Sequence, residues 1–419
     1  MIKLDEKFGK VNYCHVCNSK KLSSVVKIGS TGLCDSLLTE NQIKKKKEKS
    51  YPLNLYRCKK CQLLQLDYIV NNKKVFHLKY PYKSGITKRL KELLYANSEY
   101  LKKNFNFSKK PLAIDIGSND GTLLEGFKKK NFEVLGVEPT NIANLANKRG
   151  IKTIKKFFDI NTAKFIKKNF KKAEVITGTN IFAHVNKLNS FVEGVKMLLD
   201  KKTGLFVTES HYAVDIIDDL QYDSIYHEHL RFYLLKPLKI LMEKYGFKII
   251  DAVRIPNYAG SIRVIATLNK KIKPKPSVNK ILNMEKNRGF YSDKKYKKFS
   301  KDVFKSRNQI IKLLKNLKNK GKSIVGIGCP GRSITLLAFC KINNKIFDYI
   351  AEQKTSLKLN LYTPNTHLKV IDEKIFFKNQ PNYAFLLSWH YKKSIMRNLR
   401  KKGFKGKFIV PLPFPKIVN

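Results

Sequence analysis

The chain has 419 residues and a formal net charge of +53, and 42% of its residues are hydrophobic. This length suits two or three domains, and the hydrophobic content supports sizeable cores, which excludes a disordered chain. No apolar run approaches the roughly 18 residues of a membrane span, and residues 1–10 lack a signal-peptide core. Because Lys is scattered through every segment and Arg is sparse, we assign most of the charge to solvated surface.

The amino-terminal segment carries two C-x-x-C pairs, Cys14 with Cys17 and Cys58 with Cys61. They predict a tetrahedral four-cysteine zinc site of structural type, and two separate redox pairs are the alternative. Cys34 and His15 are competing ligands, but we expect His15 to point to solvent. An odd total of seven cysteines argues against a disulfide framework and indicates a reducing cytoplasm.

A strand pattern, QLLQLDYIV, follows the second pair and leads to the segment YPYKSG. Tyr80 and Tyr82 alternate there beside a proline. Their hydroxyl groups suit the lining of a polar substrate site, and a half-buried sheet edge explains them equally well.

The central part of the chain begins with PLAIDIGSNDGTLLEGFKKKNFEVLGVEPT. Residues 112–116 predict a buried strand, residues 122–130 a helix, and residues 132–137 a second strand that closes on Glu138. In a doubly wound sheet, ligands bind outside the carboxyl ends of such strands, where glycines permit close approach and an acid hydrogen-bonds a ribose. An ordinary strand–helix–strand unit with a tight turn is the alternative.

The residues of this turn favour S-adenosylmethionine (SAM) over a dinucleotide as the ligand. The turn lacks the third glycine of a pyrophosphate-binding loop, and Asp115 and Asp120 place carboxylates where a dinucleotide brings phosphates. SAM carries an ammonium and a sulfonium group, which carboxylates attract.

Later strands are predicted at residues 174–179 and 204–209, and the second leads to the tetrad Tyr226, His227, Glu228 and His229. This is the densest set of proton-transfer groups in the chain, so we favour catalysis over a second metal site. In a strand or an extended loop, His227 and His229 would share one face. A polar loop at the surface is the alternative.

The carboxyl-terminal part starts with a Lys-rich stretch of helical spacing and then repeats the strand, glycine turn and helix in GKSIVGIGCPGRSITLLAFC. Gly328, Gly331 and Arg332 open a helix whose amino terminus could hold a phosphate. Residues 347–351 followed by Glu352 match the pattern of residues 132–137 followed by Glu138, so they predict a strand that ends at an acidic residue. NYAFLLSWHY and GKFIVPLPFP predict further strands of a second Rossmann-like domain.

These motifs resemble the three-part sugar C-methyltransferase family that acts on nucleotide-linked deoxysugars. The resemblance covers nearly the whole chain and is most specific in the four cysteines, YPLNLYRCKKCQLLQL, YPYKSG, DIGSNDG, NIFAHV, IYHEH and the closing sequence from PNTH to FIVPLP. It implies an α/β fold with a zinc-binding domain (1–78), a Rossmann-like SAM methyltransferase domain (79–272) and a second Rossmann-like domain (273–419). Other residues are common in the family at Cys34, Ala259, Arg332 and Asn365.

The resemblance also implies roles for single residues. His229 would be the general base, with Tyr226 and Glu228 beside it and with Tyr80 or Tyr82 as a further hydroxyl donor. The predicted SAM contacts and their neighbours are Asp115, Gly117, Ser118, Asp120, Glu138, Asn180 and His184.

The acidity of the carbon that is methylated limits the possible substrates. A carbon is methylated only after a proton leaves, and that proton is acidic only beside a ketone, so we expect a nucleoside-diphosphate keto-sugar with attack from C3 beside a C4 ketone. The expected cofactors are SAM and zinc, and we expect a monomer without nucleic-acid or membrane partners. The rival interpretations are a nucleic-acid-binding protein or nucleic-acid methyltransferase with a zinc ribbon, and a non-catalytic sugar-nucleotide binding protein.

Overall fold

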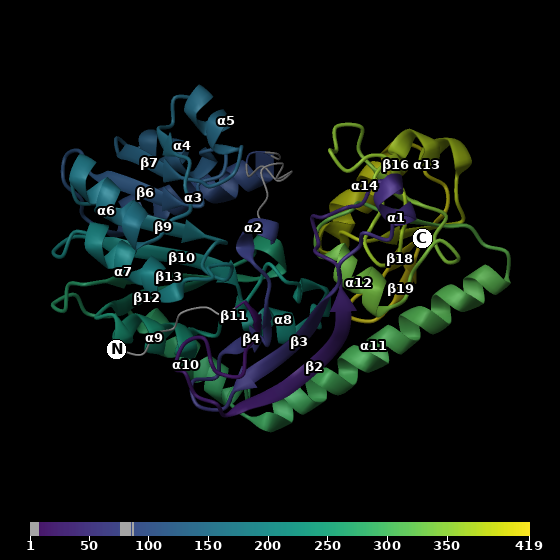
Figure 1. Cartoon of the computed structure of the whole chain (residues 1–419), viewed down its shortest axis with the longest axis horizontal. Coiled ribbons are helices and arrows are strands. Elements are labelled where there is room, and N and C mark those ends of the chain that lie inside the picture. The colour runs from purple at the N-terminus through teal and green to yellow at the C-terminus, as the bar shows by residue number, and fades with distance from the viewer. Residues whose placement is uncertain (1–7, 76–84, 86–87) are drawn as a thin grey trace.

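The computed structural model describes residues 8–75, 85 and 88–419, which form three regions, each built around its own main sheet. In Figure 1 the central and carboxyl-terminal regions stand side by side, and the amino-terminal sheet lies below them next to the long helix α11 (Asp293–Asn319). Within these described ranges, no helix is both long enough and apolar enough to cross a membrane.

The amino-terminal sheet is antiparallel, with the strand order β11-β4-β3-β2. Its strands are β2 (Leu22–Thr31), β3 (Tyr51–Cys58), β4 (Leu64–Leu66) and β11 (Arg231–Phe232). β1 (Gly9–Lys10) pairs with β5 (Tyr68–Ile69), and the region also holds α1 (Glu40–Lys44) and α2 (Asn72–Val75). Because β11 follows directly after the tetrad of residues 226–229, this sheet ties the tetrad to the amino-terminal region.

The central sheet has seven strands in the order β12-β13-β10-β9-β6-β7-β8. The strands are β6 (Leu112–Ile116), β7 (Glu133–Val137), β8 (Thr153–Ile154), β9 (Val175–Thr179), β10 (Leu205–His211), β12 (Lys248–Ile255) and β13 (Ser261–Thr267). β13 runs antiparallel to β10 and β12, while the pairs from β10 to β8 are parallel.

Helices alternate with these strands. They are α3 (Lys88–Asn104), α4 (Thr122–Lys128), α5 (Ala143–Lys148), α6 (Ile160–Asn169), α7 (Leu188–Leu198), α8 (Ala213–Asp218), α9 (Leu235–Lys244) and the short 3-10 helices η1 (Tyr222–Ser224) and η2 (Asn257–Ala259).

The apolar run of β6 explains the centre of this sheet. All five of its residues are buried, as in a parallel strand covered on both faces, and the strand has the bounds that the sequence predicts. The strand order reverses between β6 and β9, so the carboxyl ends of β6, β7 and β9 surround a topological switch point.

The carboxyl-terminal sheet confirms the predicted second Rossmann-like region. Its order is β16-β15-β14-β17-β18-β19, with only β19 antiparallel to its neighbour. The strands are β14 (Ile324–Ile327), β15 (Ile350–Glu352), β16 (Val370–Asp372), β17 (Tyr383–Leu386), β18 (Lys407–Val410) and β19 (Lys416–Val418). Its helices are α11, α12 (Ser333–Phe339), α13 (Glu373–Asn379), η3 (Trp389–Tyr391) and α14 (Lys392–Lys401), whereas α10 (Pro276–Asn287) packs against β12 of the central sheet.

One predicted strand of this region is shorter than its sequence pattern. NYAFLLSWHY is extended only as far as Leu386, and Trp389–Tyr391 forms the 3-10 helix η3. The reason is a tertiary contact, since the Trp389 Nε1–H donates to the carboxylate of Asp223 in the central region at 2.8 Å.

The amino-terminal region also contacts the carboxyl-terminal region directly. Leu38 and Tyr362 form an isolated antiparallel bridge, and the Gly32 N–H donates to Asn365 Oδ1 at 2.5 Å. All three regions therefore pack into one body, and the predicted division at residues 78 and 272 stays a prediction.

Candidate active site

Four cysteine thiols meet at the end of β3. The Sγ atoms of Cys14, Cys17, Cys58 and Cys61 all lie within 4.8 Å of one another, with Cys14 to Cys61 at 3.4 Å and Cys17 to Cys58 at 3.6 Å. A tetrahedral site with Zn–S bonds of about 2.3 Å needs sulfur separations of about 3.8 Å, so the four thiols fit zinc. Three of them are buried and none belongs to a disulfide, which suits a closed structural site.

The two competing ligands lie elsewhere. The prediction that His15 points to solvent is wrong: the residue is buried, its N–H donates to Gln65 Oε1 at 2.9 Å, and burial lowers the pKa of its imidazole well below the usual value. Cys34 donates its thiol hydrogen to Glu228 Oε1 at 2.9 Å and so belongs with the tetrad.

The glycine turn after β6 is held tightly against the end of β7. Gly117 has φ of +73°, and a Cβ there would meet Ile181 Cδ1 at 2.7 Å, so this position requires glycine. The N–H groups of Gly117 and Ser118 both donate to the Val137 carbonyl, at 2.7 and 3.2 Å. The buried Ser118 hydroxyl has no hydrogen-bond partner within the described part of the chain, which leaves a polar atom for a ligand.

Two carboxyl groups flank this turn. Burial raises the pKa of Asp115 to about 7, a 2.6 Å bond from the Thr177 hydroxyl partly opposes that rise, and the charge of Glu138 adds to it. Glu138 accepts the N–H groups of Asn119 and Thr140, at 3.1 and 2.9 Å. A cationic ligand would favour the ionised form of Asp115 and a phosphate would oppose it, so these two carboxyl groups fit SAM.

The carboxylate of Asp120 forms hydrogen bonds within the chain. Its carboxylate accepts the Thr122 N–H and hydroxyl, at 3.2 and 2.6 Å, and the Gly85 N–H at 2.9 Å, which fixes the start of α4. The predicted contact between Asp120 and SAM stays a prediction.

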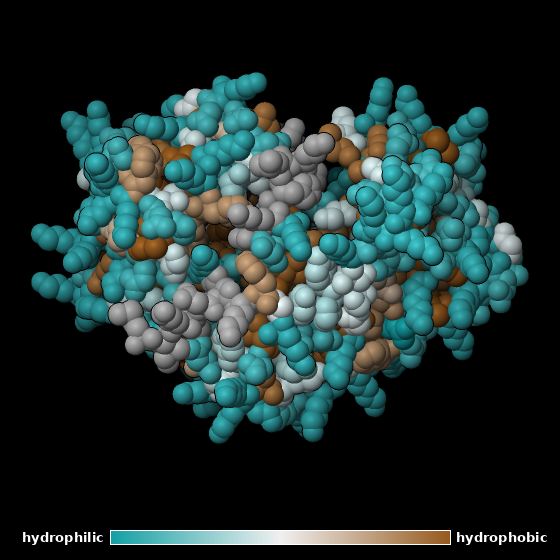
Figure 2. Space-filling model, in the orientation of Figure 1, coloured by the Kyte–Doolittle hydropathy of each residue, from teal (hydrophilic) through white to brown (hydrophobic). Residues whose placement is uncertain are grey.

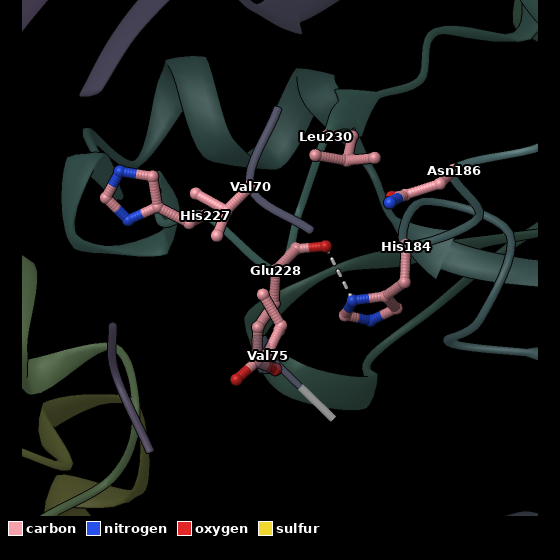
Figure 3. A pocket seen from close by; sticks show the side chains of 7 residues that line it. All are labelled: Val70, Val75, His184, Asn186, His227, Glu228 and Leu230. Carbon is pink, nitrogen blue, oxygen red and sulfur yellow. Dashed lines mark hydrogen bonds between the residues drawn. The ribbon is translucent and has the colours of Figure 1, made fainter. Parts of the chain in front are cut away.

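Asn180 and His184 connect the end of β9 to the tetrad. Asn180 has φ of +55°, and its N–H donates to the Glu209 carbonyl at 2.7 Å. His184 Nδ1 donates to the Glu228 carbonyl at 2.7 Å, and burial lowers the pKa of His184 to about 4 (Figure 3).

His229 and Tyr226 form a hydrogen-bonded pair. His229 Nδ1 lies 3.3 Å from the Ser224 carbonyl, which can only accept, so Nδ1 carries the hydrogen and Nε2 has the lone pair. The Tyr226 hydroxyl lies 3.0 Å from that Nε2 and donates to it. Burial lowers the pKa of His229 well below its usual value, with smaller contributions from His184 and His211, so the imidazole is neutral and able to accept a proton.

His227 faces a different direction from His229. Its Nε2 donates to the carbonyl groups of Tyr51 and Pro52 in β3, at 3.2 and 3.1 Å. The shared face expected for an extended segment does not form, because residues 227 and 228 make a turn. His227 thus joins the tetrad to the amino-terminal sheet.

A shallow depression that is open to solvent lies beside the tetrad. Its lining side chains, drawn in Figure 3, are Val70, Val75, His184, Asn186, His227, Glu228 and Leu230. Asn186 is buried, and its Nδ2 has no hydrogen-bond partner among the described residues, so it can donate to a ligand. Tyr80 and Tyr82, predicted at the substrate, lie outside the described residues.

The sequence alone did not single out Asn186 or His211. The His211 ring lies 5.3 Å from that of His229, at the end of β10. Two signals were available: Asn186 follows the NIFAHV motif directly, and His211 lies just past the predicted strand 204–209.

The Arg332 side chain, at the turn where a phosphate site was suggested, already has protein partners. The guanidinium group is buried and donates to both oxygens of Asp223, at 2.8 and 2.7 Å, and to Gln221 Oε1 at 3.3 Å. This ion pair crosses from the carboxyl-terminal to the central region, so Arg332 holds the two regions together instead of facing a ligand.

Comparisons with known proteins also divide the chain into three parts, although the third match begins before β13 of the central sheet. Residues 14–76 match the family model described as "Putative zinc binding domain", residues 87–252 match "Methyltransferase domain", and residues 256–413 match "C-methyltransferase C-terminal domain". The chain is also 28% identical over 417 residues to the C-methyltransferase NovU of Streptomyces niveus, an alignment that covers 98% of this chain and 97% of NovU.

Solved structures match the chain only in part. The PH0226 protein of Pyrococcus horikoshii OT3 is 14% identical, with a TM-score of 0.35, over 47% of this chain and 97% of its own. The magnesium protoporphyrin IX methyltransferase of Synechocystis PCC 6803 is 10% identical, with a TM-score of 0.33, over 44% of this chain and 89% of its own. TM-scores this low support no inference about the chain.

Proposed function

The chain belongs to the SAM-dependent C-methyltransferases that join a zinc-binding domain, a methyltransferase domain and a C-methyltransferase carboxyl-terminal domain, and we propose that its substrate is a nucleoside-diphosphate-linked keto-deoxysugar. The observation that carries the proposal is the neutral His229 paired with the Tyr226 hydroxyl in the buried tetrad whose other residues line the depression. The sequence motifs shared with sugar C-methyltransferases support the substrate class.

The chemistry follows from this pair. We propose that His229 Nε2 takes the C3 proton, so that the C–H electrons form a C3–C4 double bond and the C4 ketone becomes an enolate oxygen. For this, the Tyr226 hydroxyl first turns from Nε2 to donate to the ketone oxygen, which frees the Nε2 lone pair and stabilises the enolate as it forms. The C3–C4 electron pair then forms the new bond from C3 to the methyl group of SAM, whose S–CH3 bond would break so that S-adenosylhomocysteine leaves and the C4 ketone forms again. General-base catalysis and oxyanion stabilisation each contribute about two orders of magnitude or more.

SAM supplies an electrophilic methyl group. We propose that Asp115 and Glu138 hold its cationic and ribose ends, with Gly117 and Ser118 in the turn between them. Asp120 fixes that turn, while Asn180 and His184 link it to the tetrad. Zinc at the four cysteines stabilises the amino-terminal region, whose β3 carbonyl groups hold His227.

The nucleic-acid alternative is less well supported. Hydrophilic side chains are spread over most of the face seen in Figure 2, as expected for a solvated Lys-rich surface. The enzyme is proposed to act in the cytoplasm as a monomer, and its seven free cysteines fit a reducing compartment.

Mass spectrometry of a nucleotide-sugar panel incubated with SAM tests the proposal. We expect a 4-keto-6-deoxysugar nucleotide to gain one methyl group, which NMR should place on C3, while the matched 4-hydroxy sugar should gain none. A His229→Asn variant is the control for background transfer. Methylation of RNA or DNA with no sugar product would replace this proposal with the nucleic-acid alternative.

A further inference from the structure

One cluster of side chains joins all three regions next to the depression. Cys34 and Asp35 come from the segment after β2, Glu228 from the tetrad and Lys358 from the segment between β15 and β16. The Cys34 thiol donates to Glu228 Oε1 at 2.9 Å, and the Lys358 ammonium group donates to Asp35 Oδ1 at 2.7 Å and to the Cys329 carbonyl at 2.8 Å.

We propose that Cys34, Asp35 and Lys358 are positioning residues that hold the Glu228 side chain from the two flanking regions, so that the active site is complete only when the carboxyl-terminal region is docked. The inference rests on the proposed function in so far as Glu228 belongs to the reacting centre. It goes beyond that function because it assigns a positioning role to residues outside the tetrad.

The thiol of Cys34 is suited to orient a carboxyl group. It is 3% exposed, and burial raises its pKa well above the usual value, so it is a neutral donor that does not repel Glu228. The hydrogen bond to Oε1 restricts the orientation of the carboxyl group, so the protein also sets the direction of Oε2. Without this bond, the Glu228 side chain would lose its rotamer freedom only when a substrate orders it.

The charges around Glu228 act in opposite directions. Burial raises the pKa of Glu228 to about 8 and the Asp35 carboxylate adds to the rise, while the hydrogen bond from Cys34 and the charge of Lys358 oppose it. Tyr226 and Cys34 also face this carboxyl group and contribute no charge near neutral pH. Glu228 therefore keeps its proton at neutral pH and can donate a hydrogen bond to a substrate oxygen, as a buried neutral acid does.

The carboxyl-terminal region reaches this cluster through its glycine turn as well. A Cβ added at Gly331 would lie 3.4 Å from the Cys34 sulfur, so the turn between β14 and α12 packs on the thiol. Displacement of this region would remove Lys358 and one wall of the Cys34 site together.

Infrared spectroscopy of the zinc-loaded protein without substrate tests the contact itself. Zinc takes four of the seven cysteines as thiolates, so only Cys34, Cys329 and Cys340 retain S–H stretching bands. The band that Cys34→Val removes should shift as the pH passes through about 8, and Glu228→Gln should abolish that shift. If the frequency of the Cys34 S–H band changes neither with pH nor in the Glu228→Gln variant, the proposal is overturned, whatever the enzyme's substrate is.

Opposite pH shifts distinguish positioning from a general packing role. Asp35→Asn removes a charge that raises the pKa of Glu228, so its titration should move to lower pH, whereas Lys358→Met should move it to higher pH. A purely structural role predicts no such opposition, and equal shifts in one direction would contradict the proposal.

Turnover then shows whether positioning matters for the reaction. Cys34→Val should lower kcat about tenfold with the KM for SAM unchanged, and Cys34→Ser should restore most of the loss because it keeps a donor. Cys340→Val is the matched control, since Cys340 is also 3% exposed but lies outside the cluster. Equal kcat in the Cys34→Val and Cys340→Val variants would exclude a positioning role.

Discussion

The molecule contains the unit of strand, glycine turn and helix twice, and the two copies are built alike. In the central region, Glu138 at the end of the second strand accepts the N–H of Asn119 from the turn, at 3.1 Å. In the carboxyl-terminal region, Glu352 at the end of β15 accepts the N–H of Cys329, at 2.8 Å. The same hydrogen bond from acid to turn therefore shapes both backbones.

The side chains of the two turns differ in their partners. Among the described residues, the Ser118 hydroxyl of the first turn has no hydrogen-bond partner, and burial raises the pKa of Asp115, which suits a cationic ligand. The second turn ends in Arg332, which forms a buried ion pair with Asp223 of the central region. The same sequence pattern thus carries the proposed SAM contacts in one copy and an interdomain ion pair in the other.

Removal of zinc should have the largest effect on stability. It should unfold the amino-terminal region without abolishing SAM binding at the first turn. Cys58→Ser with Cys61→Ser should abolish the one zinc per chain found by elemental analysis and unfold the amino-terminal region, because such sites contribute about 10–16 kcal/mol. One face of the sheet that carries the first turn has a core cluster made only of central-region residues, so calorimetry should still detect SAM binding. Full zinc occupancy in the double variant would refute the four-cysteine site.

Loss of the Arg332–Asp223 ion pair should come next. Arg332→Met leaves the fully buried Asp223 carboxylate without its cation, which should lower the free energy of unfolding by about 3–5 kcal/mol. Urea denaturation measures this loss, and adding Asp223→Asn should recover part of it. The affinity for SAM should not change, and a large loss of SAM binding would show that the second turn contacts the cofactor.

Matched substitutions of the two acids compare the turns directly. Glu138→Ala should weaken SAM binding by about 10–100-fold, the value of one or two hydrogen bonds to a charged group, whereas Glu352→Ala should leave it unchanged. Titration calorimetry on both variants gives the comparison. Equal losses would mean that the effect comes from backbone disorder instead of a cofactor contact.

The pH dependence of SAM binding should show the smallest effect. Because the pKa of Asp115 is raised to about 7, the ionised form that attracts SAM is populated only as the pH rises through that value, and SAM affinity should rise with it. The same shift means that Asp115 contributes stability at low pH, and this contribution is lost as the pH rises from its ordinary value to about 7. Asp115→Asn should flatten both profiles, and an unchanged pH dependence of SAM affinity would assign the titration to another group.

The sequence predicted those features that depend on neighbours along the chain. The apolar run of β6 and the glycines after it specify a buried strand and a turn, and the paired cysteines specify the zinc site. The partner of Arg332 lies 109 residues away, and the partners of His227 lie in another sheet, so no local pattern indicates them. Tyr226 and His229 contact each other and Ser224, but the directions of His227 and Glu228 depend on such distant contacts, which is why the geometry of the whole tetrad was not predicted.

Solvent exchange of the substrate's C3 hydrogen tests the central claim most directly. In deuterium oxide, with S-adenosylhomocysteine bound so that no methyl transfer competes, the wild-type enzyme should exchange the C3 hydrogen of the keto-sugar nucleotide. His229→Asn should abolish that exchange and slow turnover by about two orders of magnitude or more while leaving SAM affinity unchanged. Exchange at the wild-type rate in His229→Asn would contradict the account and assign the proton to a different base.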